Sequence, residues 1–98
     1  MSISRDDLVT ALITGDRDVL DRIDDSILDM VEARRALVLR IAREKLSSGV
    51  PFRDPERERA MMERVGKRAR GLSPAAAQGI LAAVLAACRD GVPGGETE

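Results

Sequence analysis

Apolar residues recur in steps of three and four along the first half of the chain, between Val19 and Leu46. This spacing is the period of an α-helix with one buried stripe, and it predicts a single long helix from about Asp16 to Ser47. Charged residues occupy the opposite side of that helix. The apolar positions that define the stripe are Leu20, Ile23, Ile27, Val31, Val38 and Ile41.

Two basic residues, Arg34 and Lys45, interrupt this stripe, because continuing it through its gaps reaches both positions. A cation on the buried face of a helix is costly unless an anion or several hydrogen bonds compensate its charge. The stripe therefore indicates one wall of an anion-binding pocket. The alternative is that both long side chains lie along apolar surface with their charged ends in water.

A short helix is predicted before the long one. It starts at Ser4, whose spacing from Asp7 resembles a capping box, and it ends at Gly15.

Two further helices follow the long one, and each starts with a capping residue next to a proline. Asp54 starts a helix that stops near Gly71, and Ser73 precedes a helix from Ala75 to about Arg89. Glycines and prolines then predict a disordered tail.

The last helix is apolar on nearly all sides, so it needs more cover than two other helices of one subunit provide. This indicates a homodimer. The long helix agrees, because Arg17 lies about 42 Å from Lys45 along the helix axis, beyond the reach of any side chain. Arg17 could join Arg34 and Lys45 only from an antiparallel second copy. The alternative is that Arg17 is an exposed residue near a helix start.

The composition excludes several classes of function. The chain has 98 residues, of which 34% are charged, and its net charge of −1 does not favour nucleic-acid binding by bulk electrostatics. Phe52 is its only aromatic residue, so nucleic-acid bases would find almost no aromatic side chain to stack on. The sequence has no histidine, which removes an imidazole base and the nucleophilic pairs that need one. We expect neither a metal nor a cofactor.

Cys88 is the only cysteine and cannot form an internal disulfide, which fits a reducing compartment. Residues 1–15 carry charges where a signal peptide would need apolar residues. The longest apolar run, Ala75 to Cys88, would span about 21 Å as a helix, less than a bilayer. We therefore expect a cytoplasmic protein with no membrane partner.

Arg57 and Glu58 lie one turn before the apolar positions of the helix that follows Asp54, so we expect both side chains to project toward its buried side. The helix dipole favours Glu58 at this end but does not favour Arg57. We interpret Arg57 as a group that binds a ligand or partner carboxylate. The alternative is a structural ion pair with Asp54 or with a residue across the dimer.

A pattern of residues at particular spacings begins at Arg17 and continues through several short segments. They are Ile23-Asp24, Ile27-Leu28, Glu32-Ala33-Arg34-Arg35, Ile41-Ala42-Arg43-Glu44-Lys45, Pro51-Phe52-Arg53-Asp54 and Arg57-Glu58-Arg59. This pattern resembles the all-helical, type II chorismate mutases over about residues 16–90. The resemblance implies an all-α, three-helix subunit with one long N-terminal helix, intertwined in a homodimer. It leaves residues 1–15 as an N-terminal extension and residues 91–98 as the disordered tail.

The resemblance also implies a reaction, the [3,3] rearrangement of chorismate to prephenate. Arg34 and Arg17 of the partner subunit would hold the carboxylates of this small dicarboxylate substrate, and Lys45 would donate to its ether oxygen. The reaction needs no proton transfer, nucleophile or metal, because orientation and fixed cations can stabilise its transition state.

On the ring side of the substrate, the resemblance places Asp54, Arg57 and Glu58, with Glu58 and the Asp54 segment near the C4 hydroxyl. Two positions depart from the family, which commonly has a Ser and then a Gln at the end of the last helix. They correspond to Cys88, whose thiol is a poor hydrogen-bond donor, and to Val92, whose side chain cannot donate a hydrogen bond. We retain Cys88 among the substrate-binding residues.

These departures keep two alternatives open. One is a mutase or pyruvate-lyase that acts on 4-amino-4-deoxychorismate or isochorismate. The other is a non-catalytic helical dimer that binds a metabolite or a partner protein. The resemblance further implies that low activity could depend on an activating enzyme of the shikimate pathway, which supplies aromatic amino acid biosynthesis.

Overall fold

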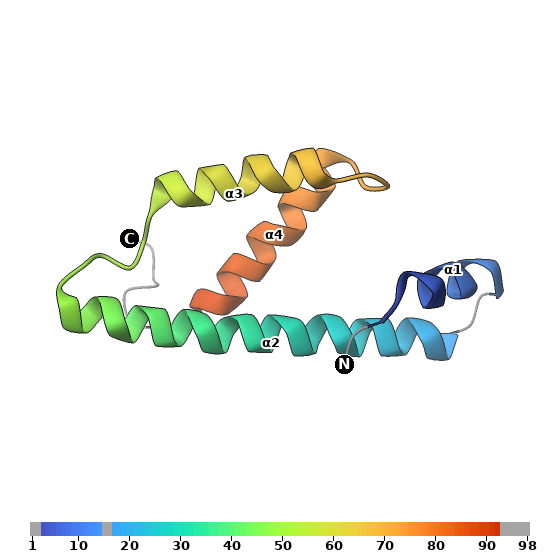
Figure 1. The fold of residues 1–98 in the computed structure, drawn as a ribbon, viewed down its shortest axis with the longest axis horizontal. Coiled ribbons are helices and arrows are strands. Elements are labelled where there is room, and N and C mark those ends of the chain that lie inside the picture. The colour runs from blue at the N-terminus through green and yellow to red at the C-terminus, as the bar shows by residue number, and fades with distance from the viewer. Residues whose placement is uncertain (1–2, 15–16, 93–98) are drawn as a thin grey trace. The chain divides into compact units, whose positions relative to one another are not determined.

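The computed structural model describes residues 3–14 and 17–92, and these ranges contain helices and loops without a strand (Figure 1). The all-α class expected from the sequence is therefore confirmed. Within the same ranges, no helix combines the length and the apolar character needed to cross a membrane. The helices are α1 (Arg5–Thr14), α2 (Arg17–Ser48), α3 (Pro55–Arg68) and α4 (Pro74–Arg89).

The chain divides into two compact units, residues 1–34 and residues 35–98, and the boundary falls within α2. The predicted break at Gly15 and the predicted helix start at Asp16 lie outside the described residues. The same is true of residues 93–98, which make up most of the predicted tail.

In the first unit, α1 begins at the predicted capping residue. The Ser4 hydroxyl oxygen accepts a hydrogen bond from the backbone N–H of Asp7 at 3.2 Å, which satisfies a donor in the first turn. Val19, near the start of α2, is buried. Other large apolar residues of this portion of α2 are exposed in the single chain, namely Leu20, Ile27, Leu28 and Met30. Much of the stripe that the sequence predicts to be buried is therefore open in one chain.

In the second unit, Gly49 ends α2 in a left-handed conformation, with φ of +76°. The N–H of Val50 donates to the carbonyl of Lys45 at 2.9 Å, and the N–H of Gly49 donates to the carbonyl of Leu46 at 3.3 Å. These two bonds form a Schellman motif, which requires a residue that tolerates positive φ. The motif fixes the last turn of α2, where Lys45 lies.

The starts of α3 and α4 follow the same capping rule. The Asp54 carboxylate accepts from the N–H of Arg57 at 3.1 Å, and the Ser73 hydroxyl accepts from the N–H of Ala76 at 3.1 Å. A proline follows each cap, at a position where its missing N–H leaves no bond unmade. Both helix starts agree with the sequence prediction.

The end of α3 comes before the predicted one. The helix ends at Arg68, and Ala69 already has extended backbone angles, although its N–H still donates to Val65. Gly71, which the prediction took as the stop, lies in the loop that leads to α4.

α3 and α4 contact each other in the second unit. The side-chain amide of Gln78 donates to the backbone carbonyl of Met62 at 3.1 Å. Gly66 leaves room for this hydrogen bond, because a Cβ at that position would lie 2.8 Å from the Gln78 amide nitrogen and would make the amide shift. The buried residues of this unit are Ala42, Ala77, Leu85, Cys88 and Val92. Because Val92 is one of these residues, the loop after α4 packs against the same core as α4 itself.

Candidate active site

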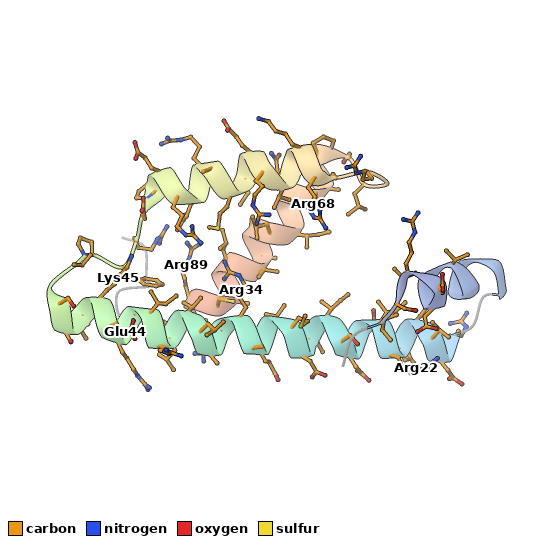
Figure 2. The ribbon with its side chains drawn as sticks, in the orientation of Figure 1. Arg22, Arg34, Glu44, Lys45, Arg68 and Arg89 are labelled. Atoms are coloured by element: carbon orange, nitrogen blue, oxygen red, sulfur yellow. The ribbon has the colours of Figure 1, made fainter. Side chains whose placement is uncertain are left out.

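The site residues that the sequence predicts come from both units of the chain. Arg17 and Arg34 belong to the first unit, where Arg17 is exposed and Arg34 is half-buried. They are separated by about 26 Å of helix, so one chain cannot bring them to the same ligand. Lys45 belongs to the second unit and is half-buried near the end of α2 (Figure 2).

Within the second unit, the structure brings three charged side chains together at the start of α3. Glu58 accepts hydrogen bonds from Arg53, which lies in the loop before α3, and from Arg89, the last residue of α4. The Arg53 Nε–Glu58 Oε2 distance is 3.1 Å, and the Arg89 Nη1–Glu58 Oε2 distance is 2.5 Å. We call Arg53, Glu58 and Arg89 the Glu58 cluster. Figure 2 shows Arg89 extending from the end of α4.

The Glu58 cluster is partly shielded from solvent, and its three side chains carry a formal net charge of +1. Its side chains are 29%, 27% and 19% exposed for Arg53, Glu58 and Arg89. Ion pairs gain strength as water is excluded, whereas exposed pairs contribute little to stability. The Arg40–Glu44 pair on α2 is the contrast, with a 3.7 Å separation and side chains that are 74% and 69% exposed. The cluster is therefore the stronger electrostatic feature of the second unit.

Asp54 and Arg57 have different surroundings from Glu58. Asp54 is exposed, and one of its carboxylate oxygens is engaged in capping α3 through the N–H of Arg57. The Arg57 side chain is exposed, although the sequence pattern predicted that it would project to the same side as Glu58. The inward row of α3 instead begins at Glu58 and continues through half-buried Met61 and Met62.

Cys88 and Val92 are both fully buried. They form part of the core of the second unit, so neither side chain is open to a ligand in the single chain. The role of Cys88 as a substrate contact stays a prediction.

Sequence reasoning assigned no role to Arg53 or Arg89. Arg53 was read only as part of a motif, next to the capping residue Asp54. Arg89 did carry a signal, because it is the one charged residue in the sequence of α4. A lone cation at the end of an apolar helix needs a counter-charge, and Glu58 supplies it.

The chemistry that this site can perform is binding and charge stabilisation. Among the described residues, no three Cys, Asp or Glu side chains gather where they could hold a metal ion. Guanidinium and ammonium groups bind carboxylates, and the Glu58 carboxylate can accept from a hydroxyl. The residues thus suit a polar anionic ligand that also carries a hydroxyl group.

The described residues thus combine an all-helical fold, cations along one long helix and a glutamate held at the start of the next helix. The family model of chorismate mutase type II matches residues 16–91, and the chain belongs to that family.

Two curated relatives show how far the similarity extends. The chorismate mutase of Methanocaldococcus jannaschii is 37% identical over 51 residues, which cover 52% of this chain and 52% of that protein. A bifunctional chorismate mutase/prephenate dehydratase of Enterobacter agglomerans is 40% identical over 47 residues, which cover 48% of this chain and 12% of that protein. The chain thus spans about half the length of the first relative and a small part of the second. No solved structure matches the chain significantly.

Proposed function

We propose that this chain is a chorismate mutase, which converts chorismate to prephenate. The match to the family over residues 16–91 is the observation that carries the proposal. The sequence resemblance assigns Arg34, Lys45 and Glu58 to the site, and the half-burial of all three side chains supports that assignment. The reaction breaks one C–O bond and forms one C–C bond within a single molecule, so the absence of histidine from the sequence is no obstacle.

Binding of the substrate uses cations from two copies of the chain. Chorismate is a dianion, and Arg34 with Arg17 of the partner subunit would hold its two carboxylates. The separation of Arg17 and Arg34 along α2 supports this arrangement, because a second copy can supply the missing charge. Exposed apolar residues on α2 support a homodimer in the same way, since they offer surface for a second copy to cover. In the second unit these residues are Leu37, Ile41 and Leu46.

Rate enhancement comes from orientation and from charge placed where the transition state needs it. Lys45 would donate to the ether oxygen, on which negative charge grows as the C–O bond breaks. Glu58 would accept from the C4 hydroxyl, with Asp54 and Arg57 nearby on the ring side. Together these contacts hold the substrate in the compact shape from which it rearranges.

The direct test is turnover of chorismate by the purified protein, with chorismate loss followed by ultraviolet absorbance and prephenate identified by chromatography. An Arg34→Ala variant serves as the site control. Turnover that disappears in this variant supports the proposal. A wild-type protein that converts no chorismate, alone or with shikimate-pathway enzymes added as activators, overturns it.

A second candidate is a sibling reaction on isochorismate or 4-amino-4-deoxychorismate, as a mutase or a pyruvate-lyase. The observation that favours it is the burial of Cys88 and Val92, which stand where the family commonly has hydrogen-bond donors. Parallel assays with the three substrates distinguish these activities by the ratio of their kcat/KM values.

A third candidate is a helical dimer without catalysis, which uses the basic positions of α2 to bind a metabolite or partner protein. Binding of chorismate without any turnover is its signature. For the enzyme we propose a cytoplasmic location, which fits a sequence whose single cysteine, Cys88, cannot form an internal disulfide.

A further inference from the structure

The two oxygens of the Glu58 carboxylate are held unequally. Oε2 accepts from Arg53 Nε at 3.1 Å and from Arg89 Nη1 at 2.5 Å. Oε1 accepts a longer bond, 3.4 Å from Arg53 Nη2. A carboxylate oxygen offers about two acceptor directions, so the two guanidinium groups fill Oε2. Oε1 keeps acceptor capacity for another donor.

We infer that Arg89 is a positioning residue that, with Arg53, fixes Glu58 and leaves Oε1 as the oxygen that accepts from a substrate hydroxyl. This inference rests on the proposed function, and it assigns Arg89 a role at a position outside the family motif. Two bonds to one oxygen oppose rotation of the carboxylate about its terminal torsion, which is otherwise broad. The side chain is therefore oriented before substrate binds, and this reduces the ordering cost of binding.

Charge gives a second reason for the arrangement. Chorismate carries two negative charges, and an uncompensated carboxylate beside it would repel it. With Arg53 and Arg89 on its carboxylate, Glu58 belongs to a cluster of net charge +1. The cluster can thus offer a carboxylate oxygen to a hydroxyl while still attracting a dianion.

The backbone around Arg89 is fixed on both sides, so this side chain does not belong to a fraying helix end. Gly91 turns the chain at φ of +71°, and the N–H of Val92 donates to the carbonyl of Arg89 at 3.0 Å. Val92 is fully buried, and Arg35 donates to the carbonyl of Asp90 at 2.7 Å. Each contact restrains the turn that follows α4, and together they hold Arg89 where it reaches Glu58.

The test is a double-mutant cycle on chorismate turnover with Arg89→Met, Glu58→Gln and the combined variant. A positioning role predicts that Arg89→Met lowers kcat/KM about tenfold, the size expected for one charge-assisted hydrogen bond. In the Glu58→Gln background, the same substitution should lower kcat/KM less than about twofold, because the carboxylate whose charge pairs with Arg89 is gone. Arg40→Met, at an exposed ion pair, is the matched control and should leave turnover unchanged.

A second measurement separates positioning from a general loss of structure. Arg89→Lys keeps the charge but not the planar fork, so it should recover part of the lost rate while retaining the helical content and melting temperature of the wild type. Equal losses from Arg89→Met in the wild-type and Glu58→Gln backgrounds would overturn the positioning role and leave the proposed function standing. A wild-type protein inactive on chorismate overturns the proposed function instead. In that case the Arg89–Glu58 ion pair is tested by measuring the unfolding equilibrium constants of the same variants. We expect the effects of the two substitutions on that constant to be coupled by a factor of at least about five.

Discussion

Arg35 donates a hydrogen bond from its guanidinium to the backbone carbonyl of Asp90, which lies 55 residues further along the chain, at 2.7 Å. The contact joins α2 to the turn that follows α4. That turn contains Gly91 in a left-handed conformation and the buried side chain of Val92. One guanidinium on α2 therefore restrains the turn that follows Arg89 and helps to orient its side chain.

Arg35→Met should weaken this restraint and lower the free energy of unfolding by about 1 kcal/mol, the typical worth of one such hydrogen bond. The measurement is chemical denaturation followed by circular dichroism. Arg40→Met provides the comparison, since that guanidinium meets a carboxylate only at an exposed pair. Equal stabilities for the two variants would show that the Arg35 contact does not restrain the turn.

Two glycines within helices should respond in opposite ways to alanine. Gly79→Ala adds a methyl group in open space, so it should stabilise the protein by up to about 1 kcal/mol through helix propensity. At Gly66 the new Cβ would lie 2.8 Å from the Gln78 amide and displace its hydrogen bond to Met62. Gly66→Ala should therefore show no gain, or a loss. Thermal melts of both variants measure the difference, and an equal gain for both would show that the Gln78–Met62 hydrogen bond adds nothing to stability.

Lys45→Met should reduce chorismate turnover on the order of a hundredfold or more, because it removes the donor proposed for the ether oxygen. Stability should change little, since Lys45 is half-buried in the single chain and forms no ion pair with another residue of the described part of the chain. Arg43→Met, two residues earlier and exposed, is a suitable control. Kinetics at saturating substrate distinguish a loss in kcat from a loss in binding, and a variant with full kcat would remove Lys45 from the site.

Mixing two inactive variants tests whether a second copy completes the site. Arg17→Ala and Arg34→Ala proteins should each have low activity alone. Exchange of subunits gives heterodimers in which one site carries both substitutions and the other carries neither, so activity should return to about a quarter of the wild-type level. Activity that stays low after verified subunit exchange would argue against Arg17 and Arg34 meeting across a dimer.

Local rules were enough to predict where the helices begin. Asp54 and Ser73 cap α3 and α4 as expected, because N-cap chemistry depends on residues within one turn. The end of α3 was less predictable. Gly71 is a strong breaker, but the chain leaves the helix at Ala69, and an alanine gives no local sign of that departure.

The Glu58 cluster could not be predicted from spacing along one helix. Arg53 lies close in sequence to Glu58, but Arg89 is 31 residues away, and their meeting depends on how α3 and α4 pack. The family pattern identified Glu58 as a site residue without indicating which groups hold it. The apolar stripe of α2 likewise predicted a helix and identified its apolar face, but it did not identify what packs on that face. Leu37 and Ile41 remain exposed in one chain.

Seven of the 16 residues of α4 are alanine, and small uniform side chains give a helix few features by which to lock into a neighbour. Such a helix could slide by one turn against α3 at little cost in packing. Gln78 near its start and Arg89 at its end each bond to a different point on α3. A polar anchor at either end therefore sets the register of the helix pair, which its apolar surface alone would leave poorly defined.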